Sequence, residues 1–463
     1  MVLTDNSAFL SVKGGRVVNR AGEAVTLRGF GLGGWMNMEN FITGYPANEE
    51  AQRQAIRKAL GDDLYTLFFD RFLEDFFAQD DARYISSLGL NLVRLGLNYR
   101  HFEDDMNPFI LKEDGFKHLD RAIEACARHN VYTILDLHAL AGYQNQHWHS
   151  DNPAHVALFW EHKHFQDRAV WLWERLAEHY KGNPWVAGYN LINEPADPQE
   201  TRIEPVYRRL TSAIRAIDAD HMIVLDGNRY STEFHMFGEP LPNVVYTNHD
   251  YALAGFVDAG PYPGISRGEQ VDRESLERKF VQRSEYMLEY DIPIWVGEFG
   301  PVYTGEPESD AMRYQVLKDQ LDIYRKYNAS WAIWTYKDIG LQGVVYAAPD
   351  SPWLERVRPI VDKKKRLGAD AWGSTDAGVR HIIGPIEELF QKEFPNYRPF
   401  PFGPGRQIAQ LVRHVLLSEP LVEEFAERFR GVTEDDIDAL MQSFLFKNCC
   451  QRTELAHILA SYA

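Results

Sequence analysis

The sequence is poor in cysteine and has no long apolar segment. Three cysteines among 463 residues, Cys126, Cys449 and Cys450, allow at most one disulfide, which excludes a disulfide framework. Nowhere do about eighteen apolar residues follow one another, as a transmembrane helix requires. Residues 1–15 lack the basic segment and the apolar core of a secretory signal. We therefore expect a cytoplasmic protein without a membrane anchor.

Positive charge is also scarce. Lys and Arg number 49 against 67 Asp and Glu, which gives a net charge of −18. Phosphate backbones and anionic lipids repel such a surface, so we expect neither nucleic acid nor membrane as a partner. Aromatic residues, in contrast, make up 13% of the chain. Most of them would fill a core, but their flat faces can also stack on sugar rings.

Short apolar segments alternate with helical patterns along the chain. The β-rich segments cover residues 26–31, 91–97, 131–137, 186–192, 222–226, 243–247, 292–296 and 330–335. Between most of them, apolar residues recur at helical spacing, over residues 48–77, 115–130, 165–180, 200–217, 271–290 and 310–327. The β-rich segments are almost continuously apolar, as parallel strands covered on both faces are. This alternation predicts an α/β fold, a (β/α)8 barrel.

Two further segments flank the predicted barrel. Residues 9–27 predict a β-hairpin, which we place at the bottom of the barrel. Residues 355–463 contain a basic run at 363–366, a Pro- and Gly-rich stretch and three amphipathic patterns. We therefore expect the barrel and its hairpin at residues 1–354, and a helical appendage packed on the barrel at residues 355–463. The basic run is interpreted as a solvated turn.

Two glutamates stand at predicted strand ends. Glu194 follows the fourth strand in YNLINEP, and Glu298 follows the seventh in IWVGEFG. A closed barrel brings both ends to one face, where barrel enzymes keep their chemistry. Two carboxyl groups about 5 Å apart can cleave a glycosidic bond with retention, because one protonates the leaving oxygen while the other attacks C1.

The order of these motifs resembles glycoside hydrolase family 5, whose members are retaining (β/α)8 glycosidases. The resemblance covers residues 10–345, and the family's further positions are matched by Arg94 in NLVRLGLN, His138 in LDLH, Asn193 beside Glu194, His249 and Tyr251 in NHDY, and Trp334 in WAIWTYKD. The resemblance implies that Glu194 is the general acid/base and Glu298 the nucleophile. It implies that the six other residues bind the substrate.

Local electrostatics agree with these roles. Arg94 and the hydroxyl of Tyr251 would favour the ionised form of Glu298. The charge of Glu298 and aromatic surroundings would favour the protonated form of Glu194, as an acid requires. Taken singly, each motif also has a structural interpretation, since NEP can begin a helix and Trp334 can belong to the core. Their occurrence together favours the catalytic interpretation.

The segment GGWMNMEN resembles the exo-acting, glucosidase- or mannosidase-like members of that family. This resemblance places Glu39 in a closed pocket for the non-reducing end, although a solvated loop carboxylate is the alternative. Long segments at 142–164, 252–270 and 337–353 would wall the barrel mouth. Trp148, with the histidines beside it, is expected to contact sugar hydroxyls. We therefore expect a retaining exo-β-glycosidase whose substrate is a short oligosaccharide or a small glycoside.

Other interpretations stay open. An endo-acting β-glucanase or mannanase, or a furanosidase, of the same family would carry the same two glutamates, whereas a non-catalytic sugar-binding barrel would need neither. Zinc could bind the histidine-rich loop after the third strand, but no HExxH motif is present and no cysteine lies nearby. We therefore expect no metal and no cofactor. The histidines concerned are His147, His149, His155, His162 and His164.

Overall fold

Eight parallel strands form a closed barrel in a computed structural model that describes residues 8–463. Their order around the barrel is β11-β12-β3-β4-β5-β6-β7-β8. They are β3 (Arg28–Leu32), β4 (Leu92–Asn98), β5 (Tyr132–Ala139), β6 (Val186–Asn190), β7 (Met222–Asp226), β8 (Val244–His249), β11 (Ile294–Glu298) and β12 (Ser330–Trp334). The predicted (β/α)8 barrel is confirmed. Residues 1–7, on which part of the expectation about a secretory signal rests, lie outside the described residues.

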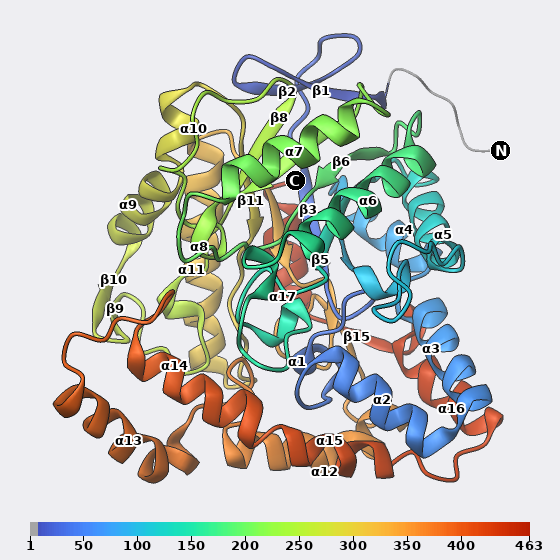
Figure 1. Ribbon diagram of the computed structural model, residues 1–463, viewed down its shortest axis with the longest axis vertical. Coiled ribbons are helices and arrows are strands. Elements are labelled where there is room, and N and C mark those ends of the chain that lie inside the picture. Colours follow the sequence, from blue (N-terminus) through green and yellow to red (C-terminus); the bar gives the residue numbers. More distant parts are fainter. Residues whose placement is uncertain (1–7) are drawn as a thin grey trace.

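Helices surround the barrel and connect its strands (Figure 1). They are α1 (Asn40–Thr43), α2 (Glu49–Leu60), α3 (Asp62–Phe76), α4 (Gln79–Ser87), α5 (Gly115–Ala127), α6 (Lys163–Tyr180), α7 (Ile203–Arg215), α8 (Asn228–Ser231), α9 (Arg273–Arg283), α10 (Glu285–Glu289) and α11 (Pro307–Lys326). The helix expected over 48–77 is two helices, because Gly61 adopts a left-handed φ of 77° between them. A small sheet of β9 (Gly264–Ser266) and β10 (Glu269–Val271) precedes α9.

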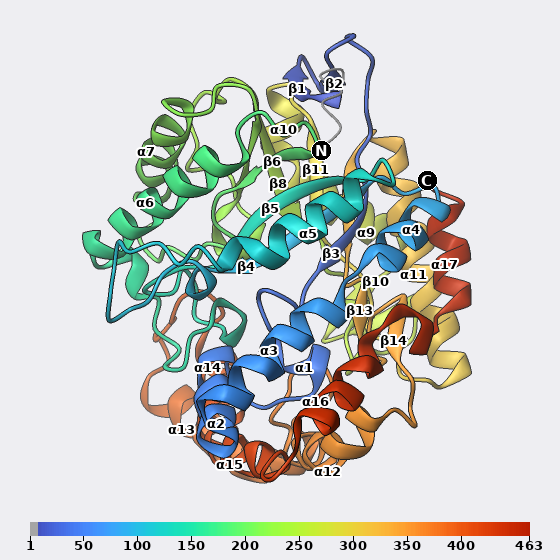
Figure 2. The ribbon, with the colours of Figure 1, turned by 90° about the vertical axis from the view of Figure 1, so that its right-hand side faces the viewer.

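The N-terminal hairpin closes one end of the barrel. Strands β1 (Leu10–Lys13) and β2 (Arg16–Asn19) pair antiparallel. Their apolar side chains join a separate core cluster with residues from the starts of the barrel strands, namely Leu10, Val17, Leu27, Leu92, Ile134, Ala187, Met222, Val224, Val245, Trp295 and Ala332. Figures 1 and 2 show the hairpin at one end of the molecule and the helices of residues 352–427 at the other. The hairpin therefore seals the bottom of the barrel, as expected.

The inner part of the C-terminal region shares the barrel's core. It contains α12 (Pro352–Leu367), α15 (Glu419–Glu427), α16 (Glu434–Met441) and α17 (Thr453–Ala460). Its strand β15 (Cys449–Gln451) pairs with β14 (Val345–Ala347), which pairs with β13 (Lys337–Asp338). Phe429 and Phe444 pack with Trp353, and Phe429 also contacts Phe68 of α3. This region is thus tied to the barrel by a sheet and by aromatic packing.

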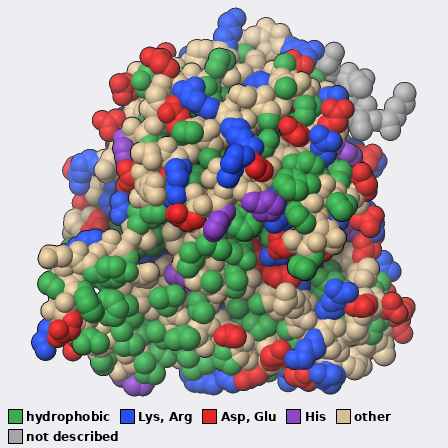
Figure 3. All heavy atoms as spheres, viewed as in Figure 1, with side chains coloured by type: hydrophobic (Ala, Val, Ile, Leu, Met, Phe, Trp, Pro, Cys, Tyr) green, Lys and Arg blue, Asp and Glu red, His purple; other side chains and the backbone are tan. Residues whose placement is uncertain are grey.

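The outer part of the C-terminal region has a small core of its own. Helix α13 (Arg380–Glu393) packs on α14 (Pro404–Gln410) and on the following π-helical turn, residues 411–416, around Val379, Ile383 and Ile408. Hydrophobic side chains gather on the face formed by α13 and α14 (Figure 3). No helix among residues 8–463 is both long enough and apolar enough to cross a bilayer.

The basic run at 363–366 is not the solvated turn that was expected. It forms the last turn of α12, and its Lys364 is buried. The Lys364 ammonium group donates hydrogen bonds to the carbonyl oxygens of Asn40 (2.9 Å) and Tyr45 (2.7 Å) and lies 3.3 Å from the Asp370 carboxylate. These partners offset the desolvation of the charge, so the run joins the C-terminal region to the loop after β3.

Candidate active site

A buried arginine organises the floor of the site. Arg94, near the middle of β4, is fully buried. Its guanidinium donates to Glu298 Oε1 (2.7 Å), Asn193 Oδ1 (2.6 Å) and Asn190 Oδ1 (3.0 Å), and it lies 3.1 Å from Asp136 Oδ1. Four partners from three further strands or strand ends therefore meet on one cation. The rigid fork of an arginine suits such a network.

Glu298, the last residue of β11, is held from two sides. Arg94 donates to its Oε1, and the hydroxyl of Tyr251 donates to its Oε2 at 2.9 Å. The His249 Nδ1 lies 3.6 Å from the same Oε2. These contacts fix the orientation of the carboxylate toward the cavity that its side chain lines.

Glu194 lies just beyond β6 and has a left-handed backbone φ of 46°, which is uncommon for a residue with a side chain. Its amide donates to Asp226 Oδ2 at 2.9 Å, a contact that supports this conformation. Its Oε1 is 2.7 Å from His249 Nδ1, and its Oε2 is 3.0 Å from His149 Nε2. The backbone thus turns the carboxyl group into the cavity between two histidines.

The pKa of Glu194 differs from the sequence-based expectation. Burial alone would raise the pKa, but hydrogen bonds from His149 and His249 outweigh it and hold the pKa well below its usual range. Burial would lower the pKa of His249, whereas the charge of Glu298 and the hydrogen bond with Glu194 raise it. The proton of this pair therefore resides on the histidine side. The expectation of a protonated Glu194 overlooked the two histidines.

The two carboxyl groups and one histidine converge. One carboxylate oxygen of Glu194, one of Glu298 and a ring nitrogen of His249 all lie within 4.8 Å of one another. Among residues 8–463, this trio is the single group of three or more His, Cys, Asp or Glu residues with the spacing of metal ligands. Internal donors already occupy it, since His249 binds Glu194 and Tyr251 binds Glu298.

A second buried network closes the inner end of the site. His138 Nδ1 is 2.6 Å from Asp136 Oδ2, and its Nε2 is 3.3 Å from Glu39 Oε1 and 3.1 Å from Asn193 Nδ2. Burial opposes the charge of the imidazole, but Asp136 prevails and raises the pKa of His138 to about 10. The ring of Trp334 stacks on His138 with centroids 5.2 Å apart. Glu39 is buried here and is not a solvated loop carboxylate.

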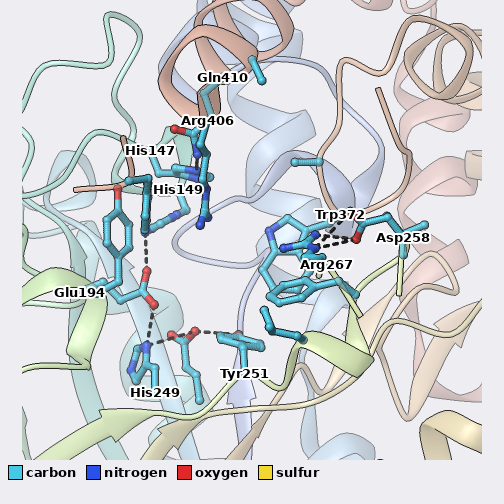
Figure 4. A pocket seen from close by; sticks show the side chains of 18 of the residues that line it. His147, His149, Glu194, His249, Tyr251, Asp258, Arg267, Trp372, Arg406 and Gln410 are labelled. Atoms are coloured by element: carbon cyan, nitrogen blue, oxygen red, sulfur yellow. Dashed lines mark hydrogen bonds and ion pairs between the residues drawn. The ribbon is translucent and has the colours of Figure 1, made fainter. Parts of the chain in front are cut away.

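These residues open onto a cavity of about 540 Å³. Glu39, His138, Glu194, His249, Tyr251, Glu298 and Trp334 line it, while Arg94 and Asn193 lie in the network beneath. Figure 4 shows Glu194, His249 and Tyr251 at its floor, with Arg406 and Trp372 farther out. The volume suits a small ligand of one or a few sugar rings.

The outer wall of the cavity differs from the expectation. Two of the three expected loops contribute, because His147 and His149 come from 142–164 and Phe256 and Arg267 from 252–270. The expected contribution from residues 337–353 is absent from the lining. The C-terminal region supplies that wall instead, through Ala371, Trp372, Ser374, Thr375, Asp376, Phe402, Arg406, Ala409, Gln410 and Arg413. No spacing in the sequence connects these residues with the glutamates, so sequence reasoning missed them.

Trp148 is not placed for the contact expected of it. Its side chain is 2% exposed, is absent from the cavity lining, and packs on Phe41 and His414. The five histidines of its loop lie in different places and make different contacts. His147 and His155 contact Gln410 of α14, His149 contacts Glu194, and His162 and His164 lie at the start of α6. This loop therefore supports the acid side of the cavity and joins it to the C-terminal region.

Comparisons with known proteins agree with this geometry. The family model described as Cellulase (glycosyl hydrolase family 5) matches residues 66–340. A protein named beta-xylosidase from Phanerodontia chrysosporium is 48% identical over 471 residues, which cover 98% of each chain. Endoglucanase C from Acetivibrio thermocellus is 23% identical and covers 65% of this chain and 95% of its own. A solved glycoside hydrolase has a TM-score of 0.52 at 19% identity, covering 68% of this chain and 90% of its own.

A (β/α)8 barrel that brings two carboxyl groups together at its strand ends has the arrangement that glycoside hydrolysis requires, and the family match identifies a barrel O-glycosyl hydrolase. The family match extends over more than half of the chain, and the xylosidase relative over nearly all of it. The chain therefore belongs to glycosyl hydrolase family 5. The resemblance found in the sequence is confirmed.

Proposed function

We propose that this enzyme is a retaining exo-β-glycosidase that removes one sugar at a time from short oligosaccharides or small glycosides. The observation that carries the proposal is that one carboxylate oxygen of Glu194 and one of Glu298 lie within 4.8 Å of each other. Retaining glycosidases hold their two carboxyl groups about 5–5.5 Å apart, whereas inverting enzymes need wider spacing to admit a water molecule. A non-catalytic sugar-binding barrel would not need this approach.

In the first step, a Glu298 oxygen attacks C1 of the bound sugar, and the bond from C1 to the leaving oxygen breaks. The leaving oxygen takes a proton from Glu194, which receives it from His249 Nδ1 at 2.7 Å. In the second step, the oxygen of a water molecule attacks C1 while Glu194 takes a proton from that water, and the bond between C1 and Glu298 breaks. The proton then passes from Glu194 back to His249 Nδ1, which restores the starting state. Both steps invert C1, so the product retains the β configuration.

The closed inner end supports exo action. Glu39 and His138 line the cavity together with the catalytic pair, and the ring of Trp334 stacks on His138. A chain bound across both glutamates would have to continue through these buried side chains. The alternative is an endo-acting enzyme with a cleft open on both sides, as the name of the endoglucanase relative allows.

The relative named beta-xylosidase adds β-xylose to the expected sugars, glucose and mannose, and its near-complete match supports xylose as the first sugar to test. Aryl β-xylosides, β-glucosides, β-mannosides and α-arabinofuranosides with one leaving group should be compared by kcat/KM. We expect β-xyloside to be the best substrate. The three free cysteines support a cytoplasmic location, which fractionation of the source cells would test.

Two measurements test the reaction itself. Proton NMR of the first product formed should show the β anomer, and the α anomer would contradict the retaining mechanism. A β-linked pentaose labelled at its reducing end should shorten one unit at a time. Early fragments of intermediate length would establish endo action instead.

A further inference from the structure

Five arginines line the cavity, and four of them have protein partners. Arg267 is paired with Asp258, Arg283 with Asp250 and Arg229 with Glu233, while Arg413 donates to carbonyl oxygens of Gly368, Asp370 and Ser374. Arg406 is the exception. Within residues 8–463 its guanidinium has no hydrogen bond or ion pair, and it lies instead over the ring of Phe402, 3.5 Å from the centroid.

Arg406 points from α14 into the cavity (Figure 4). The residue as a whole is exposed, so its guanidinium lies at the outer part of the cavity, where water and a ligand can both reach it. The group remains a cation at neutral pH. The charges of Glu194 and Asp258 act on it from a distance, but neither carboxylate forms an ion pair with it within residues 8–463, so its guanidinium is free to bind an anion.

The position of Arg406 identifies which part of a substrate it faces. The ring of Tyr230 lies 5.0 Å from that of Phe402 and 6.1 Å from that of His149, which binds Glu194. Phe402, Tyr230 and His149 therefore form one continuous wall from α14 down to Glu194. Because Glu194 protonates the leaving oxygen in the proposed function, this wall is the side on which the leaving group lies.

We infer that Arg406 binds a carboxylate on the leaving-group part of the substrate, so that the enzyme prefers acidic glycosides. The inference rests on the proposed function and specifies its substrate class. Glu39, Glu194 and Glu298 line the inner cavity and would repel an anion there. The anion would therefore bind at the outer wall, where Arg406 lies. One cation matches a single negative charge, and a guanidinium can bind both carboxylate oxygens.

The carboxylate could come from a uronic acid residue or from an aromatic acid, which could stack on the wall's aromatic rings. Two matched substrate pairs distinguish these sources. In the first, 4-carboxyphenyl β-xyloside is compared with its methyl ester. In the second, a β-xyloside of glucuronic acid is compared with that of glucose. A preference for the acid in either pair identifies the source.

The variant Arg406→Gln removes the charge, and Arg278→Gln on the exposed face of α9 is the matched control. For the preferred acid, we expect kcat/KM of Arg406→Gln to fall by about tenfold to a hundredfold. The neutral partner should be cleaved as by the wild type, and the control should change neither. Equal losses on acidic and neutral substrates would mean that Arg406 only supports Glu194, and would overturn the inference.

A binding measurement separates this inference from the proposed function. Calorimetry with free 4-hydroxybenzoate, its methyl ester, glucuronate and glucose needs no turnover. We expect the wild type to bind one of the two acids at least about tenfold more tightly than its neutral analogue, and Arg406→Gln to lose that difference. If no glycoside is cleaved but this difference is found, the proposed function fails and the anion site stands. If neither acid is preferred, the anion site fails.

Discussion

The floor of the cavity and its outer wall are built in opposite ways. On the floor, strands of the barrel hold buried charges that are nearly all paired, as Arg94, Glu298 and His249 show. On the wall, the C-terminal region presents aromatic rings and the unpaired Arg406. A rigid network of paired charges keeps the catalytic groups in one geometry. Side chains of the wall that have no protein partner can instead form their contacts with the substrate.

Removing the nucleophile should have the largest effect of all. Glu298→Ala leaves Arg94 and Tyr251 without their shared partner, and no other carboxylate can replace it at C1. We expect kcat/KM to fall by more than about 10⁴-fold, with the exposed Glu289→Ala as control. Azide should partly restore cleavage of an activated β-glycoside and yield the α-glycosyl azide. Retention of wild-type activity would refute the assignment.

Removing the acid should produce a loss that depends on the leaving group. In Glu194→Ala, sugar alkoxides cannot leave unprotonated, so we expect a decrease of about 10²–10⁴-fold for oligosaccharides. A dinitrophenolate needs no proton, so with that substrate the glycosyl-enzyme should form and accumulate, as mass spectrometry would show. An equal loss for good and poor leaving groups would exclude Glu194 as the acid.

We expect the C-terminal region and the barrel to unfold as one unit, because they share a core. Phe444 is buried against Phe72, Phe76 and Trp353. We expect Phe444→Ala to lower the free energy of unfolding by about 3–5 kcal/mol, in a single transition that activity and fluorescence both follow. Phe394, which is 54% exposed in the same region, provides the control for Phe→Ala. Two separated transitions would show that the C-terminal region folds independently.

The inner network predicts a loss of stability at alkaline pH. Because Asp136 raises the pKa of His138 to about 10, the folded state keeps a proton that the unfolded state releases near pH 6.5. The stabilisation is complete below about pH 6.5 and decreases by about 1.4 kcal/mol per pH unit up to about pH 10. Urea unfolding of His138→Gln should lack this part of the slope, unlike exposed His381→Gln. Identical slopes in wild type and His138→Gln would contradict the prediction.

The smallest effect concerns the inner end of the cavity. Glu39→Gln keeps the shape of the side chain but removes the charge that faces His138 at 3.3 Å. If this carboxylate holds a sugar hydroxyl, kcat/KM should fall by the equivalent of about 1–3 kcal/mol. The exposed Glu285→Gln is the matched control. An unchanged kcat/KM would remove Glu39 from the binding site.

The difference between floor and wall also explains what could be predicted from the sequence. Barrel strands follow from periodicity, and the polar residue at each strand end has a fixed place on one face. Glu194, Glu298 and Arg94 could therefore be grouped from their positions along the chain. No such periodicity or strand-end position predicts where Trp372 and Arg406 lie, because tertiary packing alone brings them to the cavity.

The wrong predictions about Glu194 and Lys364 also concern contacts that depend on tertiary packing. The histidines on Glu194 were not foreseen as its proton partners because His149 reaches it from an irregular loop. Lys364 stands in a run of charges that resembles any solvated segment, and its burial depends on carbonyl oxygens more than three hundred residues earlier. Every residue has a backbone carbonyl, so the residue types in a sequence do not indicate which carbonyls accept hydrogen bonds from a buried lysine.

The buried Lys364 limits how the enzyme could be re-engineered. Its ammonium group fastens α12 to the loop that carries Glu39, through the carbonyls of Asn40 and Tyr45. Exchanging the whole C-terminal region for another would strip these carbonyls of their donor and loosen the far end of the pocket. Leaving-group preference is therefore a property to alter by substitution within this region, at positions such as Arg406, and not by transplanting it as a module.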